Sequence, residues 1–370
     1  MKITCSKNHL SNALSIISKG IPSKPSTPIL SGLYMRAEGN TLELHTSNNE
    51  VGFIDKIPAD IEEAGEIVVS GRYFQEVIRS LPGDNVTITF DRNERTVHIN
   101  SNQAHFTLLS MNAAEYPTVK HIDGQLKFTI KHNILCELIK KTVFACAKDN
   151  DRPTFTGCSF STEGNKLTLA ATNSHRLAVY YEIFNEELTP AHVIIPAPVL
   201  NELLHDLSAE IPTDVQIVCD MQQISFSYEN LYICSRLISG TFPDFTRLLN
   251  INTKTHAKVN VQELRGAVDR MSLMMQGEKI NTIKFEFAQN TITLSAYNPQ
   301  LGNAEETIPA EIEGPDILIA FNGAYLSDVM KAMTTTECLI DLATPLTAIS
   351  IREVGNEQFQ YIVTPVRTAH

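Results

Sequence analysis

The sequence has no long apolar segment and no sorting signal at its start. No stretch of its 370 residues approaches the roughly 18 apolar residues that a membrane-spanning helix needs. The N-terminal segment lacks a continuous apolar core followed by a small-residue cleavage site. These absences exclude a membrane protein, and we expect a mature protein that works in the cytoplasm.

Paired cysteine ligands are also missing. The chain has seven cysteines, and none of them belongs to a C-x-x-C pair. Free thiols in a reducing compartment fit this pattern best, and neither a metal site nor a cofactor is indicated. Most of the thiols stand among apolar neighbours, so we expect a structural role, with one reactive cysteine as the alternative. The seven are Cys5, Cys136, Cys146, Cys158, Cys219, Cys234 and Cys338.

Common catalytic motifs are absent as well. The chain contains no G-x-x-x-x-G-K-[ST], no G-x-S-x-G and no H-E-x-x-H, so no phosphate loop, nucleophile elbow or zinc site is indicated. Ser174 stands directly before His175, but a serine nucleophile and its base normally meet through the fold and not as neighbours. We therefore predict a non-catalytic protein, and an enzyme remains the competing class.

Basic charge is in short supply. Acidic residues number 42 against 30 lysines and arginines, which gives a net charge of −12. Such a chain does not coat nucleic acid with its whole surface. The net charge does not exclude a local basic surface.

What the sequence does contain is a threefold repeat. Residues 32–50, 157–175 and 282–300 align without a gap at the same offset of 125 residues. Asparagine recurs at the start of each copy's second strand and again at its end, at Asn40, Asn165 and Asn290 and at Asn48, Asn173 and Asn298. Units of this length are whole domains. We predict three tandem domains, 1–122, 123–252 and 253–370, which leave little length for a separate catalytic domain.

Each repeat shows two similar halves in which a short strand leads into an amphipathic helix and then into further strands. This order predicts an α+β fold with two helices per domain and antiparallel sheets. One interpretation is three ordinary domains whose helices cover sheet faces. A sharper one is that repeats related by a constant rotation place all six helices on one side of the assembly. The expected helices are 7–19, 71–81, 132–148, 198–207, 261–274 and 322–333.

Basic residues are enriched on these helices. The first three helices sum to about +5 and all six to about +3, within a chain of −12. A basic lining on an acidic chain is one interpretation, and ordinary solvated helix faces are the other.

Five segments carry a resemblance to a known family. They are KPSTPILSG from residue 24, LSMNAAEYPTV from 109, TNSHRLAV from 172, GTFPDFTRLL from 240 and YIVTPVRT from 361. In this order and spacing the chain resembles the bacterial DNA polymerase III beta subunit, the replicative sliding clamp. The resemblance implies a DNA clamp fold, a head-to-tail homodimer that closes a six-domain ring around duplex DNA, and no catalytic activity of its own.

The resemblance also implies partners. They are duplex DNA without sequence preference, a second copy of the chain, the DNA polymerase III alpha subunit, the clamp loader, and other polymerases and repair proteins that carry clamp-binding peptides. An accessory clamp copy, acting as a non-replicative scaffold with altered partners, is the alternative function.

The family binds partner peptides in an apolar cleft between its second and third domains. The matching positions here are Arg152, Phe155, Thr172, His175, Arg176, Leu177, Pro243, Arg247, Leu248, Val363, Thr364, Pro365, Val366 and Arg367. The apolar members would receive leucine and aromatic anchors, while His175 and the arginines would fix polar groups. The chain departs from the commoner pattern at Asn173, Ser174, Thr246 and Thr364, which puts peptide preference in question.

Two further sets follow from the resemblance and the helix charges. Lys24 matches a DNA-contacting residue of the family, and the helices add Lys7, Lys19, Arg72, Arg79, Lys140, Lys141 and Lys148 as candidate DNA contacts. Phe106 and Leu108 match the ring interface and would face Leu273 and Met274 of a second copy. Buried core positions are the alternative for these four.

Overall fold

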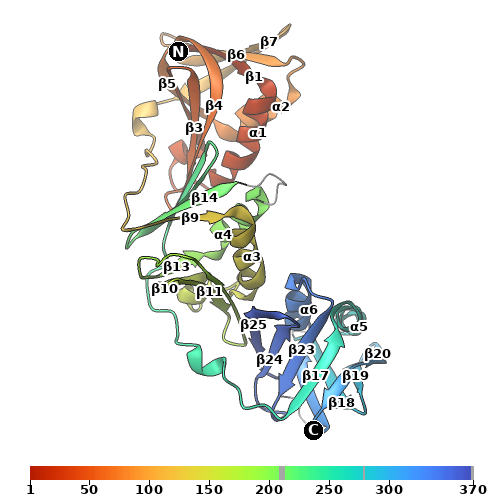
Figure 1. The fold of residues 1–370 in the computed structure, drawn as a ribbon. Coiled ribbons are helices and arrows are strands. Elements are labelled where there is room, and N and C mark those ends of the chain that lie inside the picture. Colours follow the sequence, from red (N-terminus) through yellow and green to blue (C-terminus); the bar gives the residue numbers. More distant parts are fainter. Residues whose placement is uncertain (208–212, 278–279, 368–370) are drawn as a thin grey trace. The chain divides into compact units, whose positions relative to one another are not determined.

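The computed structural model describes residues 1–207, 213–277 and 280–367 (Figure 1). Up to residue 122 the strands and α-helices are β1 (Lys2–Ser6), α1 (Lys7–Ile17), β2 (Gly32–Glu38), β3 (Thr41–Ser47), β4 (Val51–Glu63), β5 (Gly65–Ser70), α2 (Gly71–Ser80), β6 (Asn85–Asp91), β7 (Thr96–Ser101) and β8 (Ala104–Met111). Short 3-10 turns are η1 (Ser18–Gly20), η2 (Pro28–Ser31) and η3 (Ala113–Glu115).

The second and third repeats follow the same plan. Between residues 123 and 252 the elements are β9 (Leu126–Lys131), α3 (His132–Thr142), η4 (Val143–Ala145), η5 (Pro153–Phe155), β10 (Gly157–Glu163), β11 (Lys166–Thr172), β12 (Arg176–Ile183), β13 (Ala191–Pro196), α4 (Ala197–Leu207), β14 (Asp214–Cys219), β15 (Gln223–Tyr228), β16 (Leu231–Arg236) and η6 (Thr246–Leu248). From residue 253 they are β17 (Thr255–Asn260), α5 (Val261–Leu273), β18 (Thr282–Ala288), β19 (Thr291–Asn298), β20 (Gly302–Pro309), β21 (Glu311–Glu313), β22 (Ile317–Asn322), α6 (Gly323–Ala332), β23 (Glu337–Leu342), β24 (Ile349–Glu353) and β25 (Asn356–Val363).

The α+β prediction is confirmed. Among the described residues there are six α-helices, two to each repeat, and all strand pairings are antiparallel. The helix expected over 132–148 falls furthest short of its expected end, since α3 stops at Thr142 and continues only as the turn η4.

Local chemistry explains where three helices begin. Ser6 caps α1 by accepting a hydrogen bond from the His9 N–H at 3.5 Å. Asn260 accepts from two N–H groups of the first turn of α5, and Asn322 accepts from the Ala324 N–H of α6 at 3.0 Å. Each cap is the last residue of the preceding strand and satisfies N–H groups that have no partner within the helix. The strand-to-helix junction therefore recurs through the chain.

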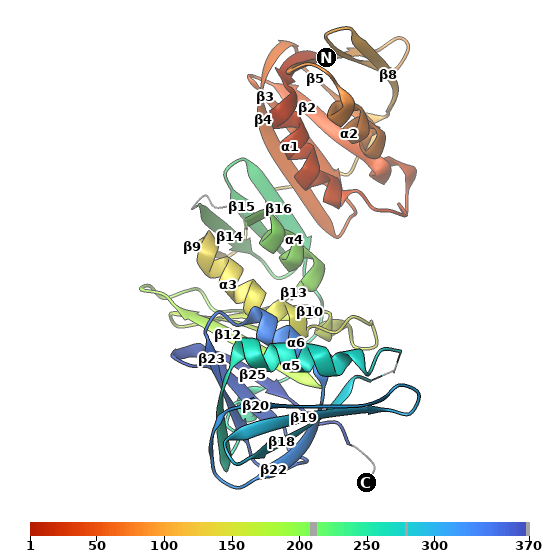
Figure 2. The same cartoon turned by 90° about the vertical axis from the view of Figure 1, so that its right-hand side faces the viewer.

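The buried helix faces match the sequence pattern. Leu10, Leu14 and Ile17 of α1 are fully buried, and so are Phe74 and Ile78 of α2. Figure 2 shows α1 beside α2 and α5 beside α6. Apolar residues three and four positions apart share one helix face, and burying that face supplies much of the helix stability.

The described chain forms two compact units. The first comprises Met1–His132 and Ala209–Leu237, and the second comprises Asn133–Ser208 and Ile238–His370. The middle repeat is thus divided, with β9 and β14 to β16 in the first unit and α3, β10 to β13 and α4 in the second. Units defined by contacts therefore do not coincide with the sequence repeats.

In the first unit one sheet joins two repeats. Its strand order is β1-β6-β7-β8-β5-β2-β3-β4-β16-β15-β14-β9, and β1 also pairs with β4, so the strands of the first repeat close on themselves. The link between repeats is the pairing of β16 with β4, from Leu231 opposite Asp55 to Ser235 opposite Val51.

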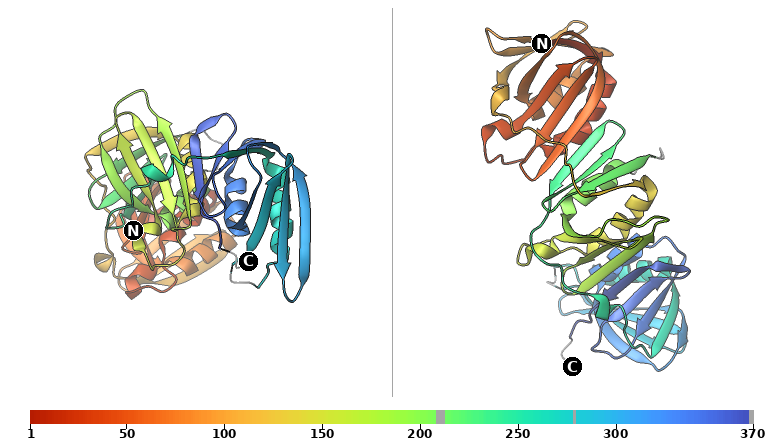
Figure 3. Two further views of the ribbon diagram at one scale, coloured as in Figure 1. Left: turned by 90° about the horizontal axis from the view of Figure 1, so that it is seen from below. Right: turned by 60° about the vertical axis from the view of Figure 1, so that its left-hand side comes forward.

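The second unit contains a nine-stranded sheet and a four-stranded sheet within its described residues. Their orders are β13-β10-β11-β12-β25-β24-β23-β17-β21 and β20-β19-β18-β22. Arg176 of β12 pairs with Val363 of β25, which joins the middle repeat to the last. The strands of the last repeat, coloured cyan to blue, are seen from two further directions in Figure 3.

The repeat extends to the chemistry of a single turn. After β3, β11 and β19 an asparagine side chain accepts hydrogen bonds from the N–H groups two and three residues later. The three asparagines are Asn48, Asn173 and Asn298. Asparagine favours such turns because its side chain imitates a backbone acceptor. The three turns share this pair of hydrogen bonds, so differences in their remaining side chains stand out.

Candidate peptide-binding site

The predicted peptide site is built around the turn between β11 and β12. Asn173 Oδ1 accepts from the N–H groups of His175 and Arg176, both at 3.1 Å. Thr172 Oγ1 accepts from the Ser174 N–H at 3.2 Å and donates to the Arg176 carbonyl at 2.6 Å. These two side chains fix the turn, and the His175 side chain is left exposed.

Arg176 anchors this turn to α6. Its Nη1 donates to Asp328 at 2.7 Å, its Nη2 donates to the Phe144 carbonyl, and its guanidinium lies 4.5 Å from the ring centre of Tyr325. The residue is 4% exposed, and its Nε has no acceptor among the described residues. The resemblance implies that Arg176 contacts the peptide. Because its side chain is buried between β12 and α6, the structure gives it a positioning role instead.

A loop and η5 bring Arg152 and Phe155 to the same turn. Arg152 Nη1 donates to Ser174 Oγ at 3.2 Å, and its guanidinium lies 5.5 Å from the ring centre of Phe155. Phe155 in turn meets Phe242, with ring centres 6.2 Å apart and planes inclined at 62°. Residues far apart in the sequence are thus connected by side-chain contacts.

The C-terminal strand reaches the turn from the other side. The Thr364 N–H and hydroxyl both donate to the His175 carbonyl, at 2.9 and 3.0 Å. Val363 is buried in the sheet, and the Val366 N–H donates to the Ala320 carbonyl at 2.8 Å. The chain beyond β25 is therefore tied to the turn between β11 and β12 and to β22.

Leu177 belongs to an apolar cluster that joins β12 to the segment 240–251. Gln360 Nε2 also donates to the Leu249 carbonyl at 2.9 Å, which ties the segment to β25. The buried members of the cluster are Ala170, Leu177, Val179 and Ile362, and the partly buried residues packed against it are Phe242, Phe245, Leu249, Ile251 and Ala348.

Contacts thus bring together four segments that the sequence separates, although peptide binding itself stays a prediction. Of the predicted residues, Arg152, His175, Pro243, Arg247, Leu248, Thr364 and Arg367 are exposed, Phe155, Pro365 and Val366 are half-buried, and Thr172, Arg176, Leu177 and Val363 are buried. An exposed rim with several arginines over a buried apolar floor suits an apolar peptide that also carries polar groups.

We did not predict the residues that hold Arg176 and Phe155 in place. Asp328, Tyr325 and Phe144 hold Arg176, and Phe242 meets Phe155. No local pattern marks them, because each supporting partner is distant in the sequence.

Two of the hollows in the described chain are lined mainly by residues that we did not predict. One of about 570 Å³ lies along the segment 240–251, and its lining includes Lys166, His192, Phe242 and Gln358. It shares Pro243 with the predicted site.

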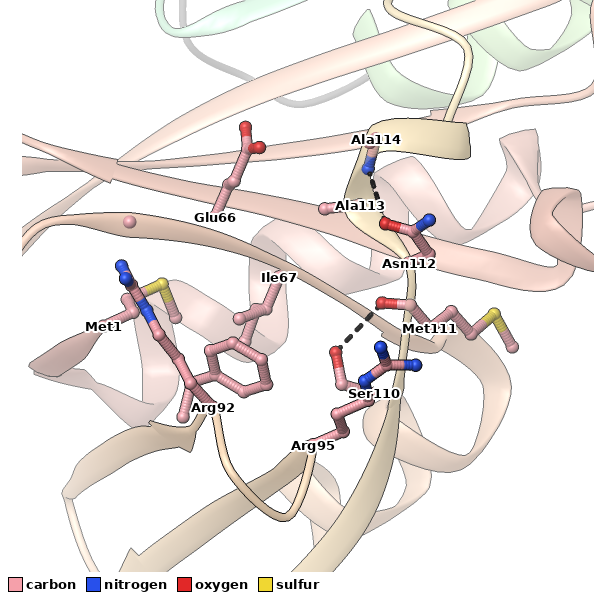
Figure 4. A pocket seen from close by; sticks show the side chains of 12 residues that line it. Met1, Glu66, Ile67, Arg92, Arg95, Ser110, Met111, Asn112, Ala113 and Ala114 are labelled. Atoms are coloured by element: carbon pink, nitrogen blue, oxygen red, sulfur yellow. Dashed lines mark hydrogen bonds between the residues drawn. The ribbon is translucent and has the colours of Figure 1, made fainter.

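The other hollow, in the first unit, measures about 460 Å³ (Figure 4). Arg92 and Arg95, on the turn between β6 and β7, line it with Glu66 and Asn112. Neither arginine has an ion-pair partner in the part of the chain that the structure describes. It contains none of the predicted site residues.

Comparisons with known proteins place the chain in a family. Three family models match in order: the N-terminal domain of the DNA polymerase III beta subunit over residues 1–120, the central domain over 129–244 and the C-terminal domain over 246–367. The chain is 31% identical to the beta sliding clamp of Bacillus subtilis strain 168, and the alignment covers 100% of both chains. It belongs to the DNA polymerase III beta subunit family.

Other relatives and solved structures agree. The chain is 28% identical to the beta sliding clamp of Staphylococcus aureus strain N315, again over 100% of both chains. The crystal structure of the Bacillus subtilis sliding clamp superposes with a TM-score of 0.96 at 30% identity. The crystal structure of a Pseudomonas aeruginosa clamp bound to griselimycin superposes with a TM-score of 0.94 at 28% identity. Both superpositions cover 100% of this chain and 100% of the other chain. The predicted domain boundaries stay predictions.

Most of the basic residues that we expected to contact DNA are accessible in this member of the family. Lys24, Arg72, Arg79, Lys140 and Lys148 are exposed. Lys7 and Lys19 are partly buried, and the Lys7 ammonium donates to the Leu81 carbonyl. DNA contact by these seven residues stays a prediction.

Lys141 does not fit the predicted role. Its side chain is fully buried, and its ammonium pairs with the equally buried Glu353 and donates to Thr334 Oγ1 at 3.3 Å. Burial raises the pKa of Glu353, but hydrogen bonds from Lys141 and from the Thr334 N–H outweigh it and leave that pKa below its usual value. A buried ammonium with these partners cannot reach a phosphate, so we remove Lys141 from the DNA-contacting set.

Two of the four predicted interface residues, Phe106 and Leu108, lie on a strand with an open edge, and Leu273 and Met274 lie at the end of α5. Residues Ala104–Leu109 of β8 pair only with β7, because β5 meets β8 at Ser110 and Met111 alone. Phe106 is 38% exposed and Leu273 is 59% exposed, while Leu108 and Met274 are half-buried. Exposure of apolar residues beside an unpaired edge is typical of an interaction surface.

No other chemistry is evident. The described residues contain no group of three or more histidine, cysteine or acidic side chains arranged for a metal ion. Burial raises the pKa of Cys5 to about 12 and that of Cys158 well above its usual value, as for inert structural thiols. No helix in the described residues is long and apolar enough to span a membrane.

Proposed function

We propose that this chain is a DNA sliding clamp and processivity factor. Two copies join head to tail into a six-domain ring around duplex DNA and tether the replicative polymerase. The observation that carries the proposal is the match of three clamp domains, in order, over the whole chain. The protein acts in the cytoplasm and has no catalytic activity of its own, so ATP-driven ring opening belongs to a separate loader.

The charge distribution supports sliding. A ring that moves along DNA needs weak, sequence-independent attraction to phosphates, because strong localised contacts would stop translation. Exposed Lys24, Arg72, Arg79, Lys140 and Lys148 provide such attraction within a chain of net charge −12. The acidic remainder repels DNA from other surfaces.

Ring closure uses the open strand edges. The edge of β8, with Phe106 and Leu108, meets the third repeat of a second copy, where Leu273 and Met274 end α5. The strand β20 pairs only with β19 among the described strands, so it presents a second free edge. Pairing two such edges across copies removes both from solvent.

Partners bind through the peptide site described above. We expect the DNA polymerase III alpha subunit, the clamp loader, and other polymerases and repair proteins to insert leucine and aromatic side chains over Phe155, Leu177 and Leu248. The exposed His175 and arginines then contact the peptide backbone and polar groups.

Topological retention on DNA tests the ring. The protein is loaded by its cognate loader onto nicked circular DNA, and the circle is then cut at one site. We expect retention on the circle and loss from the linear form, because only a ring without tight contacts behaves in this way. Equal retention on both forms would contradict the proposal, and an unloaded incubation serves as the control.

A further inference from the structure

The first repeat has a break in its sheet beside the hollow of about 460 Å³ (Figure 4). The strand β8 pairs with β5 only at residues 68–69, because the chain turns at Asn112 into η3. Residues 65–67 of β5 therefore have β2 on one side and no described strand on the other. All three line the hollow. An open strand edge is thus part of this hollow.

The backbone of Glu66 faces the opening. The Val68 carbonyl accepts a hydrogen bond from the Ser110 hydroxyl at 3.2 Å, so the backbone groups of Val68 point toward β8. Backbone groups alternate sides along a strand, so those of Glu66, two residues earlier, point the same way. No described strand pairs with them there. An unpaired N–H and C=O on a strand edge can accept an extended peptide as an added strand.

The charged side chains of the hollow favour an anion. Arg92 and Arg95 line it and are exposed, and neither has an ion-pair or side-chain hydrogen-bond partner in the described part of the chain. Glu66 is the acidic residue among the described lining residues, and its carboxylate accepts from the Tyr34 hydroxyl at 2.7 Å. An arginine has five N–H donors in a planar fork, which suits a carboxylate.

The hollow also offers apolar surface and a boundary at one end. Met1 packs against Gly65, where a Cβ would lie 3.1 Å from the Met1 Cβ, and in the view of Figure 4 Arg92 lies toward Met1. The open edge therefore ends beside a cationic group. Apolar side chains line the rest of the hollow, namely the buried Ile67 and the half-buried Phe90 and Met111.

We propose that this hollow binds the carboxyl-terminal end of an extended peptide as an added strand on β5, with the terminal carboxylate at Arg92 and an apolar side chain against Phe90 and Met111. Arg95 adds positive charge to the same hollow. A chain end fits the short edge because an internal segment would have to leave the hollow at both ends. A strand that continues the direction of β8 places its penultimate residue opposite Glu66.

The site is separate from the surfaces of the proposed function. The predicted ring contact uses residues 104–109 of β8, which lie on the other side of the pairing between β5 and β8. None of the residues predicted for the peptide site lines this hollow. The inference therefore depends neither on the ring nor on that peptide site.

Matched peptides test the terminal carboxylate. The probe is an eight-residue peptide that carries fluorescein at its N-terminus and ends in threonine, valine and leucine with a free carboxylate, and its twin ends in a carboxamide. Fluorescence anisotropy gives the Kd of each for the full-length protein. We expect the carboxamide to bind about fivefold more weakly, because it loses a charge-assisted hydrogen bond. This difference should shrink in high salt.

N-methylated probes test the added strand. A methyl group on the penultimate amide removes the N–H that would donate to the Glu66 carbonyl, so we expect binding to weaken about fivefold. The matched control carries the methyl group on the third residue from the end, whose N–H points away from β5. It should bind within about 1.5-fold of the unmodified probe.

Arginine variants then identify the carboxylate's partner. Arg92→Gln keeps a side chain of similar length without the charge, and the preference for the carboxylate over the carboxamide should fall to about 1.2-fold or less. Arg236→Gln removes an exposed arginine elsewhere in the same unit and should leave the preference unaltered.

Several outcomes would overturn the proposal. They are equal binding of the carboxylate and carboxamide probes, no binding of either, a preference that survives Arg92→Gln, and equal weakening by the two methyl groups. Displacement of the probe by an excess of an unlabelled peptide with leucine and phenylalanine anchors would place it in the predicted peptide site and would also refute the proposal. The DNA retention assay reports on the ring independently.

Discussion

Replacing Lys141 by methionine removes one charge from a buried pair and leaves a side chain of similar length. Methionine fills the same space, so the change is mainly electrostatic. Glu353 then remains buried with three donors, the Thr334 N–H at 2.6 Å, the Thr334 hydroxyl at 3.3 Å and Asn356 Nδ2 at 2.7 Å. The variant asks whether Lys141 supports the fold or contacts DNA.

We expect the free energy of unfolding to fall by about 3–5 kcal/mol at pH 7.5, because breaking a buried ion pair leaves an uncompensated charge. The three remaining donors place the expected loss nearer the lower value. The pKa of Glu353 lies below its usual value of 4.5, so the pair stabilises the protein above that pH and this stability is lost as the pH falls through the folded pKa. The cost of Lys141→Met should therefore shrink towards pH 4.5, where the stranded carboxylate takes up a proton.

Urea unfolding at pH 7.5 and pH 4.5 measures both effects. The double variant Lys141→Met with Glu353→Gln is the matched control, since it removes both charges and should recover most of the loss. A loss below about 1 kcal/mol at pH 7.5, or an equal loss at both pH values, would refute the buried-pair argument. Weaker retention on circular DNA with unchanged stability would return Lys141 to the DNA-contacting set.

Two further predictions concern the first unit. Burial, with a smaller contribution from Glu229, raises the pKa of Asp55 from 3.8 to about 6, so the folded state binds this proton more tightly and loses stability as the pH rises through 6. In urea titrations, Asp55→Asn should raise the free energy of unfolding by up to about 3 kcal/mol at pH 8 and by almost nothing at pH 4. An equal gain at both pH values would contradict the pKa shift. Phe106→Arg should convert the dimer to a monomer in light scattering, whereas Met221→Arg, at a position that is 92% exposed, should not; a dimer that persists in both would contradict the predicted interface.

Helix positions followed from the sequence because their cause is local. Leu10, Leu14 and Ile17 recur at helical spacing, and the structure buries all three. The same holds for Phe74 and Ile78 of α2. The equal offset of the three repeats similarly anticipated three equivalent turns. Periodicity and turn chemistry depend on neighbours within a few residues, so one sequence suffices to see them.

Side-chain roles at the site did not follow in the same way. Lys140 and Lys141 are adjacent and alike in sequence, yet successive residues on a helix point about 100° apart, and the structure exposes the first and buries the second. Besides Glu137 one helical turn earlier, Lys141 pairs with the buried Glu353, 212 positions away. Arg176 likewise meets Asp328 across 152 positions. Charge counts along a helix cannot identify such partners, because the pairing depends on strand connections between repeats.

The pairing of β16 with β4 bears on how the chain folds during synthesis. Val51 and Asp55 lie opposite residues that the ribosome adds roughly 180 positions later, which at about 5–20 residues per second is roughly 10–40 s. Once Met111 has been made, the first repeat has all of its own strands, and yet the edge of β4 beside Phe53 and Ile54 still lacks its neighbour. An unpaired apolar edge can pair with another nascent chain. The strand that joins two repeats in the finished protein therefore leaves an edge in the oldest part of each growing chain unpaired until the middle repeat is almost complete.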